Sequence, residues 1–317
     1  MVNRVALFAG IICLAIAPLA WADAALDAAL ALFPASSDVL VTLSPEGQQQ
    51  LEEVIQVLRT ELAIPDFLDE TNETEVGNFP VALEKKDLVN KLSQAYYTYA
   101  DVFLRDLPNQ SDTFLKGKQW GFKSLRMNPA FAAFEERDGF VAAVEHETDV
   151  PALYWTNGNW LRWAEPRLFD ALKSGLAKKS LAISERIVAL DPTYICYGPY
   201  RTLAAYWQGL PAGPFGRVFT GGPEQDYDKV LDYTCRVVDE PTICAGSSGL
   251  VDPICDMYFE NRLFFAQYYL IPQKLWADAA RVLQSILDDP IGELYPLYNA
   301  LNQQLAATQL AKVQEHL

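Results

Sequence analysis

Apolar side chains recur at helical spacing along most of this chain, and that spacing most limits the folds open to it. In residues 85–106 they stand three or four positions apart, at Leu88, Leu92, Ala95, Tyr96, Tyr99 and Phe103. This period is typical of an amphipathic helix with one buried face. Stretches rich in strand-forming residues are short, as in residues 38–43. The chain is therefore predicted to be all-α.

Helix start and stop signals divide this pattern into elements. Ser44 suits an N-cap and Pro45 suits the first helical position, so a helix is predicted to begin there and to end near Ile64-Pro65. Residues 66–82 are acidic, contain a glycine and a proline, and lack periodicity. They are predicted to form a loop.

Three proline boundaries suggest a repeat. Asn128-Pro129, Asp191-Pro192 and Asp289-Pro290 each follow an amphipathic run. The prolines are 63 and 98 positions apart (192 − 129 and 290 − 192), close to two and three units of about 32–33 residues. The alternative is that these pairs are spaced by chance.

Small residues precede the first two boundaries at matching offsets, and small side chains let antiparallel helices approach closely. They are Gly117, Gly121 and Ser124 before Pro129, while Ser180, Ser184 and Ile187 stand at the same offsets before Pro192. We therefore predict an irregular α-solenoid of tetratricopeptide-like helical hairpins, forming a single domain over residues 23–317.

The first 22 residues have the pattern of a signal peptide. A positive charge at Arg4 precedes an apolar run over residues 5–19, and Ala20-Trp21-Ala22 supplies small residues for cleavage after Ala22. The run is shorter than the about 20 apolar residues that span a membrane, so no direct membrane insertion is expected. A lipoprotein anchored at Cys13 is the less favoured alternative, because the preceding Ile12 is not small. We expect a soluble periplasmic protein.

Export places the remaining cysteines in an oxidising compartment, where disulfides form. They are Cys196, Cys235, Cys244 and Cys255. Four cysteines allow three pairings, which the sequence cannot distinguish. The pairing we favour is Cys244–Cys255, which closes a short loop, with Cys196–Cys235. A zinc site is the weaker alternative, because there is no close C-x-x-C pair and no nearby histidine.

Charge and motif content exclude several functions. The formal net charge of −16 disfavours nucleic acid and anionic lipid as partners. The only histidines, His146 and His316, lie in no catalytic motif, and the neighbouring carboxylates Glu135-Glu136 and Asp288-Asp289 point about 100° apart on a helix. We expect no enzymatic activity, no catalytic residue, no metal and no cofactor.

Tryptophan and tyrosine are concentrated between Asp149 and Pro223, where a cavity or a partner surface is the functional interpretation. The candidate ligand-binding residues are Tyr154, Trp155, Trp160, Trp163, Tyr200, Arg201, Tyr206 and Trp207. Aromatic residues at helical spacing also suit an ordinary core. Arg201 lies in an apolar helix, so it requires either a carboxylate of the protein or a wet cavity in which it could hold a ligand carboxylate.

The glycine-rich segment 209–222 lacks the Gly-Lys-Ser/Thr ending of a phosphate-binding loop. The acidic residues Glu224, Asp226 and Asp228 follow it and would repel an anion. A close-packed connection or a partner-facing edge is the better interpretation.

Several blocks, in this order, resemble the T-component family of TRAP transporters, often called TatT. They are YYTYADVFL (96–104), GKQWGFKSLRMNPAF (117–131), VPALYWTNGNW (150–160), ALDP (189–192), GPYRTLAAYW (198–207) and GGPEQDYDKV (221–230). The similarity covers roughly residues 85–300 and carries no catalytic motif. The chain departs from the family pattern in lacking a convincing lipobox and in an apparent insertion, Glu240–Pro253, that holds Cys244.

The resemblance implies a non-enzymatic periplasmic subunit that forms a homotrimer. It would bind the solute-binding P component of a TRAP transporter and could channel its ligand. The alternative is a tetratricopeptide-like adaptor that binds a protein or peptide and no small solute. A closed pocket lined by Trp155, Trp160 and Arg201 favours the solute, whereas an open groove favours the peptide.

Overall fold

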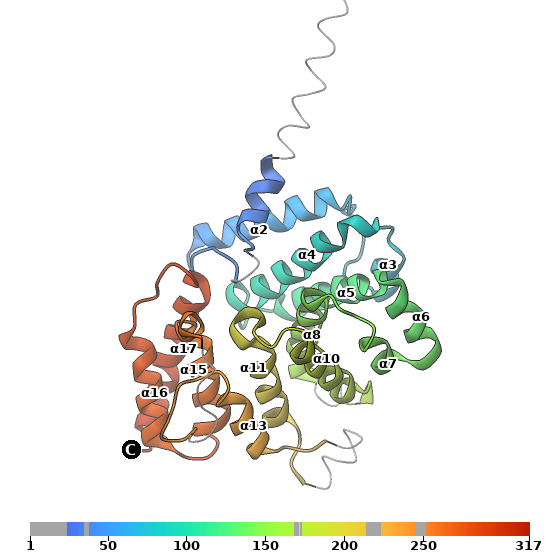
Figure 1. Cartoon of the computed structure of the whole chain (residues 1–317). Helices are drawn as coiled ribbons and strands as arrows, with labels where there is room; N and C mark the ends of the chain where they lie inside the picture. Colours follow the sequence, from blue (N-terminus) through green and yellow to red (C-terminus); the bar gives the residue numbers. More distant parts are fainter. Residues whose placement is uncertain (1–23, 35–37, 168–170, 172, 214–222, 245–251) are drawn as a thin grey trace, which may run out of the picture.

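The protein is all-helical, as predicted. The computed structural model describes residues 24–34, 38–167, 171, 173–213, 223–244 and 252–317, and this part of the chain contains helices and no strand (Figure 1). The longer helices are α2 (Pro45–Glu61), α4 (Lys86–Thr98), α5 (Gln110–Met127), α6 (Pro129–Asp138), α8 (Val150–Ala164), α10 (Leu176–Leu190), α11 (Tyr194–Gly209), α13 (Tyr227–Thr234), α16 (Trp276–Asp288) and α17 (Pro296–Gln314). Shorter ones are α3 (Glu73–Asn78), η1 (Leu83–Lys85), η2 (Tyr99–Phe103), α7 (Phe140–Val144), η3 (Glu165–Arg167), α14 (Pro253–Asp256), α15 (Phe259–Phe265) and η4 (Ala266–Leu270). The predicted signal peptide and Cys13 lie outside the described residues.

Helices that are near in sequence pack side by side. α4 contacts α5, α10 contacts both α8 and α11, α11 contacts α13, and α16 contacts α17. Figure 1 shows α16 and α17 on one side, α6 and α7 on the other, and α8, α10 and α11 between them. This order agrees with a chain of helical hairpins, while the irregular α-solenoid remains a prediction.

The N-terminal elements follow their sequence signals with one exception. The side chain of Ser44 accepts a hydrogen bond from the backbone N–H of Gly47 at 3.1 Å, and α2 begins at Pro45 as predicted. α4 continues through the π-helical turn η2 to Phe103, which matches the helix predicted for residues 85–106. The loop predicted for residues 66–82 is wrong over α3, where Asn72 caps the first turn. Asn72 and Glu75 form a capping pair that the sequence already contained.

The small residues of α5 and α10 do permit close helix packing. A Cβ added to Gly117 would lie 2.2 Å from Asn159 Oδ1, and one added to Gly121 would lie 2.4 Å from Thr156 Oγ1. Both neighbours belong to α8, so α5 approaches α8 at van der Waals contact. On the other side of α8, Asn157 donates to Ser184 Oγ of α10 at 3.0 Å. α8 is therefore held between α5 and α10.

Two of the three proline boundaries begin a new helix. Pro129 is at the start of α6, where the side chain of Asn128 accepts from two backbone N–H groups. Pro192 stands two residues before α11. The third boundary was wrong, because five residues separate Pro290 from α17, which begins at Pro296 instead.

The cysteines form two disulfides, but the pairing that we favoured from sequence was wrong. The bridges are Cys196–Cys255 and Cys235–Cys244. α14 packs against the first turn of α11, which brings the Cα atoms of Cys196 and Cys255 to 5.0 Å. The turns that follow α13 bring Cys244 back to Cys235, with their Cα atoms 5.3 Å apart. Sequence distance could not show either approach.

Candidate functional site

Trp155 is a core residue at the centre of the molecule. The side chain of Asp149 caps α8 by accepting from the N–H of Ala152 at 3.1 Å, which fixes where this helix begins. The ring of Trp155 packs at 5.4 Å from that of Tyr97, and its Nε1 donates to the hydroxyl of Tyr194 at 3.1 Å. Its polar atom is thus satisfied within the protein.

Trp160 and Trp163 point to a different cluster. The Trp160 ring packs at 5.0 Å from Phe122 of α5 and at 5.9 Å from Phe140 of α7. Together with Trp163 these rings line a small cavity of about 250 Å³ that neither Trp155 nor Arg201 reaches.

Three of the other predicted aromatics, Tyr200, Tyr206 and Trp207, lie on α11. The Tyr200 ring stacks on Tyr233 at 6.1 Å, and Lys229 Nζ lies 3.5 Å from the ring centroid of Trp207. Tyr206 lines another, mostly apolar cavity of about 260 Å³. The eight predicted side chains therefore line no single pocket.

The start of α11 adopts a left-handed backbone. Ile195, Cys196 and Tyr197 have φ values of 46°, 47° and 65°. Each such residue costs roughly 1–2 kcal/mol relative to the right-handed form. Gly198 follows, and a Cβ there would lie 2.4 Å from the hydroxyl of Tyr154. Local sequence does not favour this conformation, so tertiary contacts must hold it.

Arg201 supplies part of that restraint. Its side chain is 2 % exposed, and its Nε lies 2.9 Å from Glu260 Oε2 of α15. One terminal nitrogen donates to Asn261 Oδ1 at 2.6 Å and to the carbonyl of Cys196 at 2.5 Å, while the other donates to the carbonyl of Ile195 at 2.9 Å. Of the two interpretations left open by the sequence, the structure shows pairing with the protein.

A buried carboxyl adjoins this network. Asp38 Oδ2 accepts from the hydroxyl of Tyr258 at 2.5 Å, and Asp38 Oδ1 has no partner in the described structure. The guanidinium of Arg201 lies 4.7 Å from the ring of Tyr258. Burial raises the pKa of Asp38 from 3.8 to about 7, although the Tyr258 hydroxyl acts in the opposite direction. This cluster joins the segment before α2 to the C-terminal helices.

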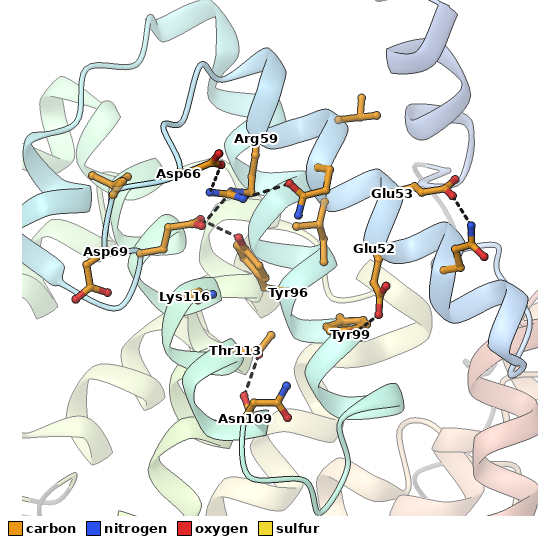
Figure 2. Close-up of a pocket in the computed structure, with 16 residues that line it drawn as sticks. Glu52, Glu53, Arg59, Asp66, Asp69, Tyr96, Tyr99, Asn109, Thr113 and Lys116 are labelled. Carbon is orange, nitrogen blue, oxygen red and sulfur yellow. Dashed lines mark hydrogen bonds and ion pairs between the residues drawn. The ribbon is translucent and has the colours of Figure 1, made fainter.

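The structure also contains an open groove that the sequence did not reveal. It has a volume of about 1030 Å³ and lies between α2, the α4–η2 helix, the start of α5 and residues 66–70 (Figure 2). Figure 2 shows Glu52 and Glu53 on the α2 wall, with Tyr96 and Tyr99 behind them and Lys116 and Thr113 on α5. Residues 66–70 of the predicted loop form one of its walls.

One carboxylate of the groove is structural. Glu70 Oε2 accepts from the hydroxyl of Tyr96 at 2.8 Å and from Trp120 Nε1 at 2.6 Å, and Arg59 Nε lies 3.1 Å from Glu70 Oε1. Burial, followed by the Glu70 charge, raises the pKa of Tyr96 well above its usual value. Glu70 therefore orders the wall and is not open to a ligand.

The accessible charged groups of the groove are mainly acidic. Exposed carboxylates stand at Glu52, Glu53, Asp66 and Asp69, against the cations Arg59 and Lys116. Phe67 lies beside Asp66 with 89 % of its surface exposed, the most of any large apolar side chain in the described part of the chain. An acidic groove, with an exposed aromatic residue in the loop that forms one wall, suits a cationic segment of another protein.

No group of three or more His, Cys, Asp or Glu side chains in the described residues could hold a metal ion, and no described helix has the length and apolarity to cross a membrane. His146 stacks on Phe134 at 3.4 Å and His316 on Trp276 at 4.3 Å. Residues 214–222 of the glycine-rich segment lie outside the described residues.

No protein-family model matches the chain, and a search of curated proteins finds no match. The likeness to the TRAP T-component family therefore depends on the sequence blocks alone.

Proposed function

We propose that this chain is a non-catalytic binding subunit that docks a partner protein in the groove of Figure 2. The observation that carries this proposal is the open groove of about 1030 Å³, with four exposed carboxylates and the exposed ring of Phe67 beside it. Trp155, Trp160 and Arg201 do not share a closed pocket, which favours a protein segment over a solute as the main ligand.

The partner that the family resemblance suggests is the solute-binding P component of a TRAP transporter, with this chain acting as a periplasmic homotrimer. The adaptor function is the second candidate. The same groove supports it, but an adaptor would bind a cationic segment of a protein other than the P component. The two candidates differ in the partner and not in the surface.

Binding of a purified P component to the mature chain tests the proposal. Charge reversal at Glu52 and Glu53 together is expected to slow association and to weaken binding at least tenfold, with the loss greatest at low salt. Phe67→Ser is expected to raise the dissociation rate. Glu84→Lys and Leu83→Ser, which change exposed residues outside the groove, are the matched controls.

Three outcomes separate the candidates. Binding of the P component that the groove variants weaken supports the TRAP assignment. Failure of the P component to bind, combined with binding of an unrelated lysine-rich peptide in the groove, supports the adaptor. A strict monomer at micromolar concentration, measured by mass in solution, contradicts the proposed trimer.

A further inference from the structure

The small cavity beside Trp160 is separate from the groove. It has a volume of about 250 Å³, lies among α5, α7, α8 and α10, and shares no lining residue with the groove. Helical spacing builds its walls, since Lys118 and Phe122 are one turn apart on α5, and Trp160 and Trp163 are about one turn apart on α8. Phe140 of α7 closes the aromatic wall.

Lys118 is the unusual member of this cavity. It is 8 % exposed, and its Nζ lies 4.6 Å from the ring centroid of Trp163 and 5.4 Å from that of Phe122. No hydrogen bond or ion pair joins its ammonium group to any of the described residues. Burial lowers the pKa of Lys118. A buried lysine without a hydrogen-bonded or ion-paired anion is uncommon, because burial disfavours its charged form.

A second ammonium group lies on the same ring. Lys179 Nζ is 5.6 Å from the centroid of Trp160, and Lys118 Nζ is 5.8 Å from it. Within the described part of the chain, Lys179 also has no ion pair. The two charges repel each other, and each disfavours the other unless an anion lies between them.

The nearby carboxylates are bonded to another cation, although the charge of Glu73 partly offsets the lowering of the Lys118 pKa. Glu73 and Glu135 line the cavity, but Arg126 holds both, with its NH1 3.1 Å from Glu73 Oε1 and its Nε 2.8 Å from Glu135 Oε2. The chain has 41 acidic and 25 basic residues, so an unpaired pair of lysines is not a consequence of composition.

We propose that this cavity binds a small organic carboxylate. The carboxylate group is placed between Lys118 and Lys179, where each ammonium donates to it, and the apolar body packs against Trp160 and Trp163. The volume is below the about 300 Å³ at which pockets for drug-sized molecules begin, so the ligand is small. This site does not depend on the proposed partner or on the TRAP assignment.

Calorimetry of the mature chain with benzoate tests the proposal, with tryptophan emission as a second readout. Benzoate is expected to bind, and benzamide, which has the same shape without the charge, at least tenfold more weakly. Lys118→Met is expected to weaken benzoate binding at least tenfold. Lys178→Met changes an exposed neighbour of Lys179 and is expected to leave binding unchanged.

Folding of the variants is measured in parallel. Lys118→Met removes a desolvated charge and keeps the side-chain length, so its thermal midpoint is expected to equal or exceed that of the original protein. Loss of binding by a folded Lys118→Met protein supports the site. No binding of benzoate at millimolar concentration, equal binding of benzamide, or tighter binding of inorganic phosphate than of benzoate overturns the proposal.

Discussion

Replacing Arg201 by methionine tests the central network of the fold. Methionine replaces the unbranched apolar stem of arginine but lacks the guanidinium. The substitution therefore removes the partner of Glu260 and the donors to the carbonyls of Ile195 and Cys196. Breaking a buried ion pair from one side costs about 3–5 kcal/mol. Because Glu260 retains some exposure, we expect the lower end of that range, near 3 kcal/mol.

That loss is large against the roughly 5–15 kcal/mol by which domains are stable. Urea unfolding followed by circular dichroism measures it, provided that the slope with denaturant stays the same in the variant. The matched control is Arg236→Met, which removes a half-exposed pair with Asp232 and is expected to cost under about 1 kcal/mol. Removing Glu260 as well, in an Arg201→Met/Glu260→Met protein, is expected to restore part of the stability.

Equal losses of stability in Arg201→Met and Arg236→Met would contradict this role of Arg201. So would a double variant whose loss equals the sum of the losses in Arg201→Met and Glu260→Met. Either result would mean that Glu260 does not neutralise the charge of the Arg201 guanidinium. Arg201 would then again be a candidate for binding a ligand.

Two further predictions concern the disulfides and the buried carboxyl. Peptide mapping of the unreduced protein is expected to recover Cys196–Cys255 and Cys235–Cys244. A recovered Cys244–Cys255 peptide would refute the pairing. Replacing both cysteines of a pair by serine should lower the free energy of unfolding by about 4 kcal/mol for Cys196–Cys255, whose cysteines are 59 residues apart. For Cys235–Cys244, whose cysteines are 9 residues apart, the loss should be about 2.5 kcal/mol. Because burial raises the pKa of Asp38 from 3.8 to about 7, the neutral form favours folding. The free energy of unfolding should therefore fall by up to about 4 kcal/mol as pH rises from 4 to 7. Unfolding measured across this pH range should show that the Asp38→Asn substitution abolishes the fall.

The sequence predicted the helices better than the contacts between them. Helical spacing and caps act over a few residues, so the start of α2 at Pro45 and the role of Gly121 followed from local patterns. The disulfide pairing did not, because it depends on how α14 packs against α11. The left-handed turn at Ile195 has no local signal either, because tertiary contacts, among them those of Arg201 and the Cys196 bridge, hold it.

The candidate sites show the same division. Trp160 and Trp163, two of the predicted residues, line a cavity, but Lys118 was not predicted, because on α5 it is one more polar position of an amphipathic helix. Its significance arises only when α7, α8 and α10 exclude water from it. Glu52 was likewise an ordinary exposed acid until the loop of residues 66–70 formed the facing wall of the groove.

α5 carries one side of each proposed site, and its geometry keeps them apart. Lys116 lines the groove and Lys118 lines the cavity, and two residues on an α-helix point about 200° from each other. The position of the helix is set by Gly117 and Gly121, which fit against Asn159 and Thr156 of α8 and are not part of either site. A carboxylate in the cavity can therefore neutralise Lys118 without moving the groove wall. Variants of the two sites consequently test two separate hypotheses, and the failure of one leaves the other standing.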